Sequence, residues 1–294
     1  MTSITIQRAA SARRRIRRSR AVHIVVCALA GLTAVPLLAI IGKVVVEGWR
    51  QMGWRFLTQS MPSAVEAMVA AATGQGIPGG IANGIVGTLL MLLMASAVAI
   101  PVGILCGVYL SENRGSGFAK TVSYLTDLLQ GTPSIILGII VYAWVVVPTR
   151  GYSALAGSVA LFIMMLPLIV RSTEETLAML PPALKEAGMA LGGSHPRVVL
   201  RVLLPSAFGG IFTGILLAVS RVIGETAPLM FTALGAYAIQ WNVSRPMSAV
   251  PLLIWQFFND PNLQPLIWGA SLFLLLFVLI LNIASKLLAR RWRT

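Results

Sequence analysis

The apolar residues of this chain gather into long uncharged runs, and charged residues separate one run from the next. A run of about 20 apolar residues is long enough to cross the hydrocarbon core of a bilayer as a single helix. The pattern predicts six membrane-spanning helices, at 21–42, 83–110, 128–148, 151–170, from about 203 onward, and at 265–285. A polar segment, 117–127, precedes the third and is expected to lie at the interface.

The fifth apolar segment is interrupted. Residues 203–220 are apolar, Arg221 and Glu225 follow, and 226–244 is again uncharged. Two full spans here would send the basic C-terminus to the outside. We therefore predict one discontinuous or re-entrant element, broken near Pro228, whose far part lines a cavity enclosed by protein, since irregular backbone at membrane depth is tolerated only there.

Composition supports an all-α polytopic membrane protein. The chain is 57% hydrophobic and 11% charged, with a mean hydropathy of +0.84, whereas soluble domains are roughly 25% charged. The net charge of +14 would suggest nucleic acid in a soluble protein. Here the charges lie in loops and tails, so membrane topology explains them better and nucleic acid is not an expected partner.

Lysine and arginine are distributed unequally between the two sides that six spans define. With the N-terminus inside, 17 of the 23 fall on the cytoplasmic side and five outside, and Arg221 lies within the membrane. This bias follows the positive-inside rule. It places the basic tail 1–20, the loop 171–202 and the C-terminal tail 290–294 in the cytoplasm. The arginines of the first tail could contact anionic lipid.

The first apolar run has two interpretations. A basic region, an apolar run and Ala28-Leu29-Ala30 fit a cleavable signal peptide. The uncharged run, however, continues for 22 residues, which is long enough to span and long for a signal peptide. We favour an uncleaved first span, and the region 21–79 then comprises this helix and an outer loop.

The loop 181–205 carries strong local signals. Pro181-Pro182 can open a helix, Gly192-Gly193 can end it, and Ser194 with Pro196 can begin a second helix. The second helix runs into the fifth span. A short helix, a glycine turn and a helix continuous with the membrane would suit a mechanical link to a partner, although charge and glycine alone also fit an ordinary amphipathic loop.

The spacing in this loop resembles the EAA loop of ABC-importer permeases, which reads E-A-A, three residues, G, nine residues, I-x-L-P. The matching residues are Glu186, Ala187, Gly192, Leu204 and Pro205, while Gly188 replaces the second alanine and Val202 replaces isoleucine. The resemblance implies that 186–205 seats in a groove on a cytoplasmic ATPase. Glu186 would be the docking charge, and Ala187 and Gly188 would keep the helix slim.

Charges inside a span mark function by default. Arg221 lies 18 residues after Leu203, which is about 27 Å along a helix, and Glu225 follows at the i,i+4 position on the same face. Arg221 could line a path for an anion with Glu225 orienting it, or the two could form a structural salt bridge. Arg171, where the fourth span meets the cytoplasm, could contact a leaving anion or simply reach the interface.

Enzymatic chemistry finds no support in the sequence. The chain has no G-x-x-x-x-G-K-[ST] and no H-E-x-x-H. Cys27 and Cys106 lie in apolar runs, and neither His23 nor His195 has a nearby carboxylate or metal-ligand companion in sequence. We expect no catalytic residue, no metal site and no bound cofactor on this chain.

A second resemblance narrows the class. The stretch Ser220–Leu229 is similar to R-x-x-G-E-T-A-P-L of phosphate importers, and Gly87-Thr88-Leu89-Leu90, Tyr109-Leu110-Ser111-Glu112 and Thr132-Pro133-Ser134-Ile135 resemble their other landmarks, in the same order. The E-T-A-P form resembles the PstA-type permeases. The region 80–289 would then be the permease core with five spans in a type I, MetI-like fold.

This resemblance implies a complex in a bacterial plasma membrane. It would contain a second, PstC-type permease, a dimer of ATP-binding subunits that use ATP and Mg²⁺, and an external phosphate-binding protein. Arg171, Arg221, Glu225 and Thr226 would belong to the substrate pathway. An arginine alone cannot separate phosphate from sulfate or molybdate, so a permease for another oxyanion stays an alternative. A secondary transporter or channel is another, although it would leave the EAA-like loop unexplained.

Overall fold

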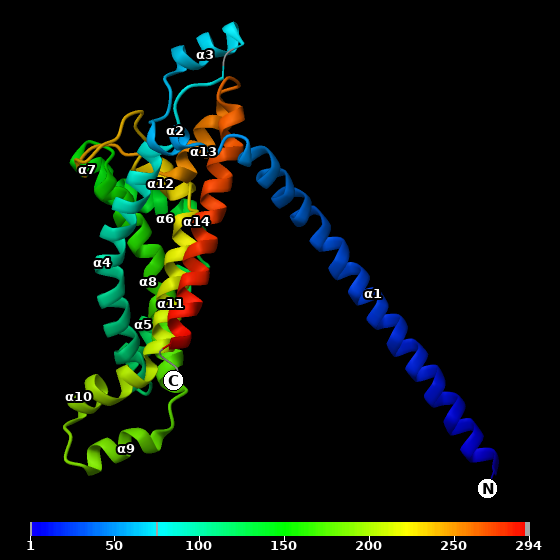
Figure 1. Ribbon diagram of the computed structural model, residues 1–294. Coiled ribbons are helices and arrows are strands. Elements are labelled where there is room, and N and C mark those ends of the chain that lie inside the picture. Colours follow the sequence, from blue (N-terminus) through cyan, green and yellow to red (C-terminus); the bar gives the residue numbers. More distant parts are fainter. Residues whose placement is uncertain (1, 75, 292–294) are drawn as a thin grey trace.

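The computed structural model describes residues 2–74 and 76–291, and most of them are helical (Figure 1). The elements in chain order are α1 (Thr2–Trp49), α2 (Trp54–Thr58), α3 (Ala64–Thr73), α4 (Ala82–Glu112), α5 (Gly117–Gly131), α6 (Ser134–Val141), the π-helix η1 (Tyr142–Val146), α7 (Val147–Thr149), α8 (Ala154–Ala178), α9 (Pro182–Ala190), α10 (His195–Val198), the π-helix η2 (Val199–Leu203), α11 (Leu204–Ile223), α12 (Ala227–Thr232), α13 (Val250–Asn259) and α14 (Gln264–Arg291). Within this described part the only strand-like pairing is an isolated bridge between Leu234 and Met247.

The prediction of six spans is confirmed, with one of them broken. Among the described residues five helices are long and apolar enough to cross a membrane, at 22–49, 82–112, 154–178, 195–223 and 264–284. The pair 117–131 and 134–149 meets the same criteria together but is bent by 107°. Counting the bent pair as one broken span gives six.

The third span differs from its prediction. It was expected as one helix over 128–148 behind an interfacial segment, but α5 begins at Gly117 and ends at Gly131. Thr132 is extended, with φ −76° and ψ 131°, because the ring of Pro133 disfavours a helical conformation in the residue before it. Pro133 also lacks the N–H that a continuous helix would need. The helix therefore breaks inside the apolar run, close to its start.

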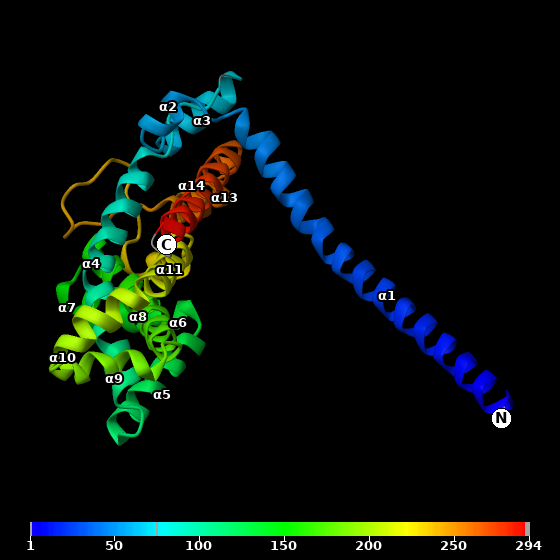
Figure 2. The same cartoon turned by 60° about the horizontal axis from the view of Figure 1, so that its bottom comes forward.

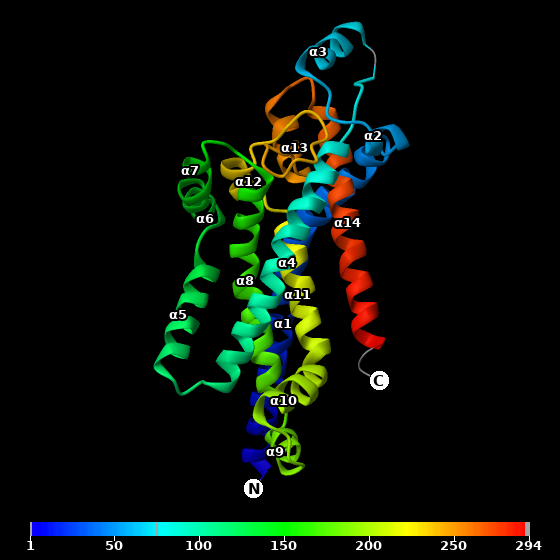
Figure 3. The same ribbon diagram turned by 90° about the vertical axis from the view of Figure 1, so that its left-hand side faces the viewer.

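Four long helices, α4, α8, α11 and α14, run side by side along the molecule (Figures 1 and 3). The largest buried cluster lies between the first three, where Met91, Met165 and Ile169 are fully buried. By contrast α1 leaves this bundle at a wide angle (Figures 1 and 2). Its last turns contact α14, where Gly48 faces Trp268 and Leu272, but none of its apolar window is buried.

Glycines allow the bundle helices to approach closely. A Cβ on Gly107 of α4 would lie 2.6 Å from Cβ of Thr173 in α8, and one on Gly103 would lie 2.7 Å from Ile169. On α11, Gly210 and Gly214 face Thr176 and Ser172 of α8, and a methyl group at either glycine would overlap with these side chains. The spacing Gly210-x-x-x-Gly214 thus marks a helix contact of the kind that small residues permit in membranes.

The fifth span is interrupted as expected, but a few residues earlier. The helix that starts at His195 ends at Ile223, and Gly224 is its C-cap. Pro228 lies in the first turn of α12, where a proline is well tolerated because its N–H would be unpaired anyway. A Cβ on Gly138 of α6 would lie 2.7 Å from Cα of Pro228, so α12 packs tightly on α6.

A small cap covers the end of the bundle opposite α9 (Figure 1). It contains α2 and α3, and Phe56 of α2 packs with the fully buried Phe257 of α13. Ser63 begins α3 with a capping box, in which its N–H and its hydroxyl both donate to Glu66. These bonds hold the pKa of the Glu66 carboxyl below its usual value.

Candidate functional site

The loop 181–205 forms the predicted helix, turn and second helix. Pro182 opens α9, which ends at Ala190, and Ser194 precedes α10. The second helix continues through η2 into α11, so 195–223 is one unbroken helical element. We call the segment from Pro182 to Val198 the α9–α10 hairpin. It projects from the lower end of the bundle in Figure 1.

The glycines of the hairpin have distinct roles. Gly192 adopts a left-handed conformation with φ +83°, and its N–H donates to the Met189 carbonyl while the Gly193 N–H donates to the Gly188 carbonyl. This pair of bonds is a Schellman motif, which ends the helix and satisfies its last carbonyls. Gly192 is thus the residue that sets the direction of the turn.

Gly188 and Gly193 bring the two arms of the hairpin together. A Cβ on Gly188 would lie 2.9 Å from Cγ1 of Val198, and one on Gly193 would lie 2.7 Å from the Gly188 carbonyl. An alanine at 188 would therefore press on Val198, which is 2% exposed. Glycine rather than the alanine of the EAA pattern fits the close contact between α9 and α10.

One face of α9 is anchored and the other is free in this single chain. Leu184 packs against a buried cluster that contains Leu177 of α8, Val198 of α10 and Leu203 of η2. Glu186 and Ala187 are exposed, and so is Leu191 beside them, at 90%. The helix therefore presents a small, apolar surface with one carboxylate.

Pro205 explains the π-helix at the start of the fifth span. It is exposed in the first turn of α11, directly after η2 (199–203). Because proline has no N–H, the regular bond to the carbonyl four residues earlier cannot form, and the turn widens. Such a bulge is a local weak point at which the helix can bend.

Sequence reasoning missed Glu112, the last residue of α4. Its Oε2 accepts hydrogen bonds from Nζ of Lys185 at 2.5 Å and contacts Nε2 of His195 at 2.6 Å. The expectation that His195 has no carboxylate nearby is therefore wrong in space, because its partner is 83 residues away in sequence. The motif Tyr109-Leu110-Ser111-Glu112 was noticed, but nothing local in it indicates these contacts.

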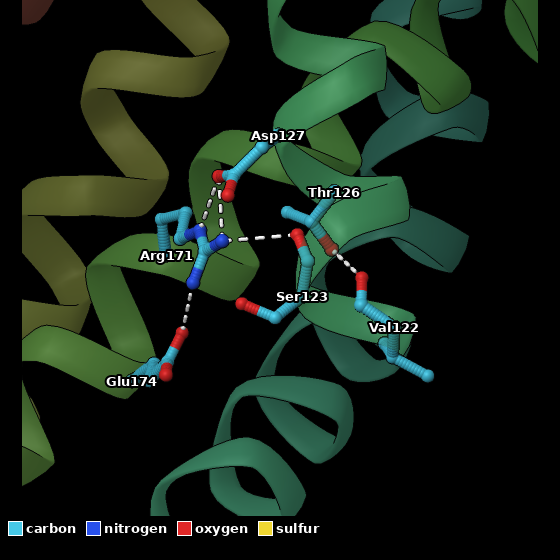
Figure 4. Close-up of polar contacts among 6 residues, drawn as sticks. All are labelled: Val122, Ser123, Thr126, Asp127, Arg171 and Glu174. Carbon is cyan, nitrogen blue, oxygen red and sulfur yellow. Dashed lines mark hydrogen bonds and ion pairs between the residues drawn. The ribbon is translucent and has the colours of Figure 1, made fainter. Parts of the chain in front are cut away.

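Arg171 is held by a network of its own (Figure 4). Its Nε donates to Asp127 at 2.9 Å, Nη1 to Glu174 at 2.7 Å, and Nη2 to the Ser123 carbonyl at 2.9 Å. The guanidinium thereby joins α8 to α5. We call these four residues the Arg171 network. The charge of Arg171 is already matched by two carboxylates, and α8 continues beyond this residue to Ala178.

Arg221 lies in the last turn of α11 and is exposed. A cation is favoured at this end of a helix, because the unpaired carbonyls there carry partial negative charge. The predicted pair with Glu225 does not form: within 2–74 and 76–291 the ion pairs involve other residues. Glu225 cannot take the i,i+4 position because the helix has ended at Ile223, and its N–H bonds instead to Val222.

The remaining predicted pathway residue, Thr226, caps α12 and is half-buried, as is Glu225. The structure thus brings Arg221, Glu225 and Thr226 to one break in the chain. Arg171 belongs to a different contact, between α5 and α8. The four residues form no single cluster among the described contacts.

Fold and site together define a polytopic helical transport subunit, in which a glycine-turned hairpin is fixed to a membrane-spanning helix. The sequence profile of the family "Binding-protein-dependent transport system inner membrane component" matches residues 99–294. Three relatives share a more specific name. The chain is 37% identical over 235 residues to "Phosphate transport system permease protein PstA" of Pasteurella multocida (strain Pm70), covering 79% of this chain and 84% of that one.

It is also 40% identical over 217 residues to the protein of the same name in Xylella fastidiosa (strain Temecula1), covering 72% and 76%. With the "Probable phosphate transport system permease protein PstA" of Methanocaldococcus jannaschii it shares 35% over 258 residues, covering 87% and 88%. The chain therefore belongs to the PstA permeases within the family of binding-protein-dependent transport system inner membrane components.

Solved structures confirm the fold. A chain of the MetNI methionine ABC transporter, in inward-facing conformations, superposes with a TM-score of 0.57 at 22% identity, covering 71% of this chain and 93% of that chain. The predicted MetI-like architecture is therefore correct.

Proposed function

We propose that this chain is a transmembrane permease subunit of an ATP-driven ABC importer that moves inorganic phosphate into the cell by alternating access. The observation that carries this proposal is the unbroken helical element 195–223. One end of it is built into the α9–α10 hairpin, and the other end presents Arg221. The substrate class follows from the names of the PstA relatives and from the chemistry of an exposed arginine, which binds oxyanions well.

The placement of Arg221 supports a second permease subunit. The exposed face of α11 carries Thr213, Leu217 and Arg221, spaced four residues apart. An arginine on this face of a spanning helix would cost at least a few kcal/mol against lipid. A second, PstC-type permease would cover the face and leave an aqueous path beside Arg221, with Glu225 and Thr226 at the same break in the chain.

The hairpin supports an ATPase partner. Glu186 and Ala187 lie on the exposed face of α9, and the opposite face is anchored in a buried cluster. A groove on an ATP-binding subunit could therefore grip α9 and tilt the helix beyond Gly192 and Pro205. ATP and Mg²⁺ would be used by a dimer of these subunits, since the sequence carries no P-loop, and this chain would act as a permease and not as an enzyme.

The charge bias supports a cytoplasmic location for the hairpin and both termini. An external phosphate-binding protein would then meet the opposite end of the bundle, which carries α2, α3 and α13. ATP binding would close the ATPase dimer and turn the path outward, and hydrolysis would reset it. The membrane would be the plasma membrane of a bacterium.

Uptake of radiolabelled phosphate tests this function. The full complex in vesicles should take up phosphate only with internal ATP and external binding protein, and excess sulfate should not compete. Arg221→Gln should abolish uptake with assembly intact, whereas Arg245→Gln, an exposed arginine in the loop before α13, should leave it unchanged. Uptake without ATP would contradict the ABC mechanism, and competition by sulfate would contradict phosphate specificity.

A further inference from the structure

A single carboxylate ties both arms of the α9–α10 hairpin to α4. Oε2 of Glu112 lies 2.5 Å from Nζ of Lys185 in α9 and 2.6 Å from Nε2 of His195 at the start of α10. We call these three residues the Glu112 clamp. Only 14% of the Glu112 side chain is exposed, whereas Lys185 and His195 are 35% and 49% exposed. The carboxylate is therefore the buried centre of the contact.

The position of Glu112 is electrostatically unfavourable without these partners. It is the last residue of α4, where the unpaired carbonyls of the helix carry partial negative charge that disfavours an anion. Burial adds a desolvation penalty that a carboxylate offsets only with good hydrogen bonds. Both terms are relieved when Lys185 and His195 approach, so the hairpin has a preferred seat at the end of α4.

Two adjacent residues on α9 face different partners. Lys185 turns towards Glu112, and Glu186 is exposed on the surface available to a partner. A force applied at Glu186 therefore reaches Lys185 within one residue. From there it can pass to α4 through the clamp, in addition to the direct route through α10 into α11.

The second route reaches the core of the bundle. Glycines at 103 and 107 hold α4 against α8, with Thr173 fully buried at the contact. The helices α4 and α8 should therefore respond together to a pull at Glu112. Without the clamp, the hairpin keeps its covalent route through η2 and the apolar contact of Leu184 with the cluster around Leu177, but no charged contact with α4. The π-helix of η2 is a point at which bending can absorb the motion.

We propose that Glu112 is a positioning residue that couples the hairpin to α4, so that ATPase motion displaces α4 and α8 together with α11. This proposal rests on the importer function given above. It assigns Glu112 no contact with substrate. Its effect is on how much transport each hydrolysed ATP produces.

Glu112→Gln in the full complex is the main test, because it keeps the size of the side chain and removes its charge. We expect assembly and ATP hydrolysis to persist, while phosphate taken up per ATP hydrolysed falls roughly tenfold, because the contacts with Lys185 and His195 both lose the charge of the carboxylate. Glu175→Gln is the matched control, since Glu175 is an exposed carboxylate near the C-terminal end of the neighbouring helix α8. It should leave the ratio unchanged.

Exchange of the charges tests whether the contact itself matters. The variant Glu112→Lys combined with Lys185→Glu should recover uptake per ATP relative to Glu112→Lys alone. Should Glu112→Gln fail to assemble, Lys185→Gln removes the same contact from the partly exposed side, and Lys185→Arg should retain most of the coupling. The proposal would be overturned if the charge exchange did not recover uptake per ATP and Lys185→Arg did not retain it.

A distance measurement separates this proposal from the importer function. Spin labels at the exposed positions Arg114→Cys and Leu191→Cys report the seating of the hairpin on α4, without any substrate, in a background of Cys27→Ser and Cys106→Ser. We expect a narrow distribution that broadens with Glu112→Gln and not with Glu175→Gln. An unchanged distribution together with unchanged uptake per ATP would refute the clamp. Loss of ATP-driven uptake in the unmodified complex would instead refute the importer function.

Discussion

Single residues in this chain are explained by partners that are far away in sequence. Arg171 donates to Asp127 and to the Ser123 carbonyl, 44 and 48 residues earlier, and Glu112 meets His195 across 83 residues. Hydropathy identifies such charges at the ends of spans but cannot pair them, because the pairing depends on which helices are neighbours. For Arg171 the pairing favours a structural role over contact with a leaving anion.

Replacing Arg171 should destabilise the contact between α5 and α8. Arg171→Gln leaves Glu174, whose side chain is 16% exposed, with an unpaired charge, and should cost about 2 kcal/mol. Thermal unfolding of the purified complex should show the loss of stability. The stability of Arg171→Lys should lie between those of the unmodified protein and Arg171→Gln, because lysine cannot contact both carboxylates in the same fork geometry.

The combination of Arg171→Gln with Glu174→Gln provides the internal control. It should restore part of the stability, because no buried charge is then left unpaired. A single variant with normal stability but altered phosphate affinity would contradict this explanation and favour the pathway role.

The turn of the hairpin can be tested at Gly192. With φ +83° and no atom near a Cβ there, Gly192→Ala introduces strain without a clash, at a cost of about 1 kcal/mol. Binding of the ATP-binding subunits should weaken roughly fivefold, as measured by titration of the purified subunits. Gly115→Ala, which also meets no neighbour but lacks the positive φ, should bind normally. Equal affinities for both variants would show that the turn does not shape the docking surface.

At the scale of elements, apolar runs predicted the number of spans but not their bends. The run 128–148 has the composition of one helix, yet Thr132 and Pro133 break it and produce the 107° bend. In the fifth span the interruption was predicted from Arg221 and Glu225, but the helix ends before Pro228, at Ile223, with Gly224 at the C-cap position. At Thr132 the boundary is fixed by the proline that follows and not by hydropathy.

For the α9–α10 hairpin, by contrast, the turns were predicted correctly. Its helix, turn and second helix were predicted from Pro182, Gly192 and Ser194, because prolines and glycines act locally. The sequence could not reveal that the hairpin packs on Leu177 and contacts Glu112, since these residues come from α8 and α4. Local signals define the shape of the element, and tertiary contacts define its position.

The contact between α8 and α11 should depend on Gly214. A side chain there would overlap with Ser172, so Gly214→Ala should separate the helices and lower the yield of folded complex severalfold, a consequence of overpacking at about 1–3 kcal/mol. Fluorescence-detected size exclusion would measure the yield. Ser172→Gly in the same chain should restore it by removing the overlapping atoms, and Gly224→Ala, with open space at its Cβ, should behave like the unmodified protein. A failure of Ser172→Gly to rescue would place the defect elsewhere.

At the scale of the whole molecule, the sides of the membrane predicted from the lysines and arginines agree with the two ends of the helix bundle. The beginning of α1, the end of α14 and the α9–α10 hairpin all lie towards one end, and α2, α3 and α13 lie towards the other (Figure 1). Among the residues that the structure describes, the lysines and arginines assigned to the cytoplasm from sequence alone belong to segments towards the first end, and the five assigned to the outside belong to segments towards the second. Because positive loops remain inside during insertion, the hairpin end should face the cytoplasm.

Labelling of single cysteines can measure this orientation in intact cells. In a background of Cys27→Ser and Cys106→Ser, Ala72→Cys at the exposed end of α3 should react with a membrane-impermeant maleimide from outside. Ser194→Cys, exposed in the turn of the hairpin, should react only after permeabilisation. The two positions control for each other: Ala72→Cys must be labelled in both conditions, and Ser194→Cys only after permeabilisation. Reaction of Ser194→Cys in sealed cells would place the hairpin outside, where no cytoplasmic ATPase could reach Glu186, and the route from ATP hydrolysis to Arg221 would be lost.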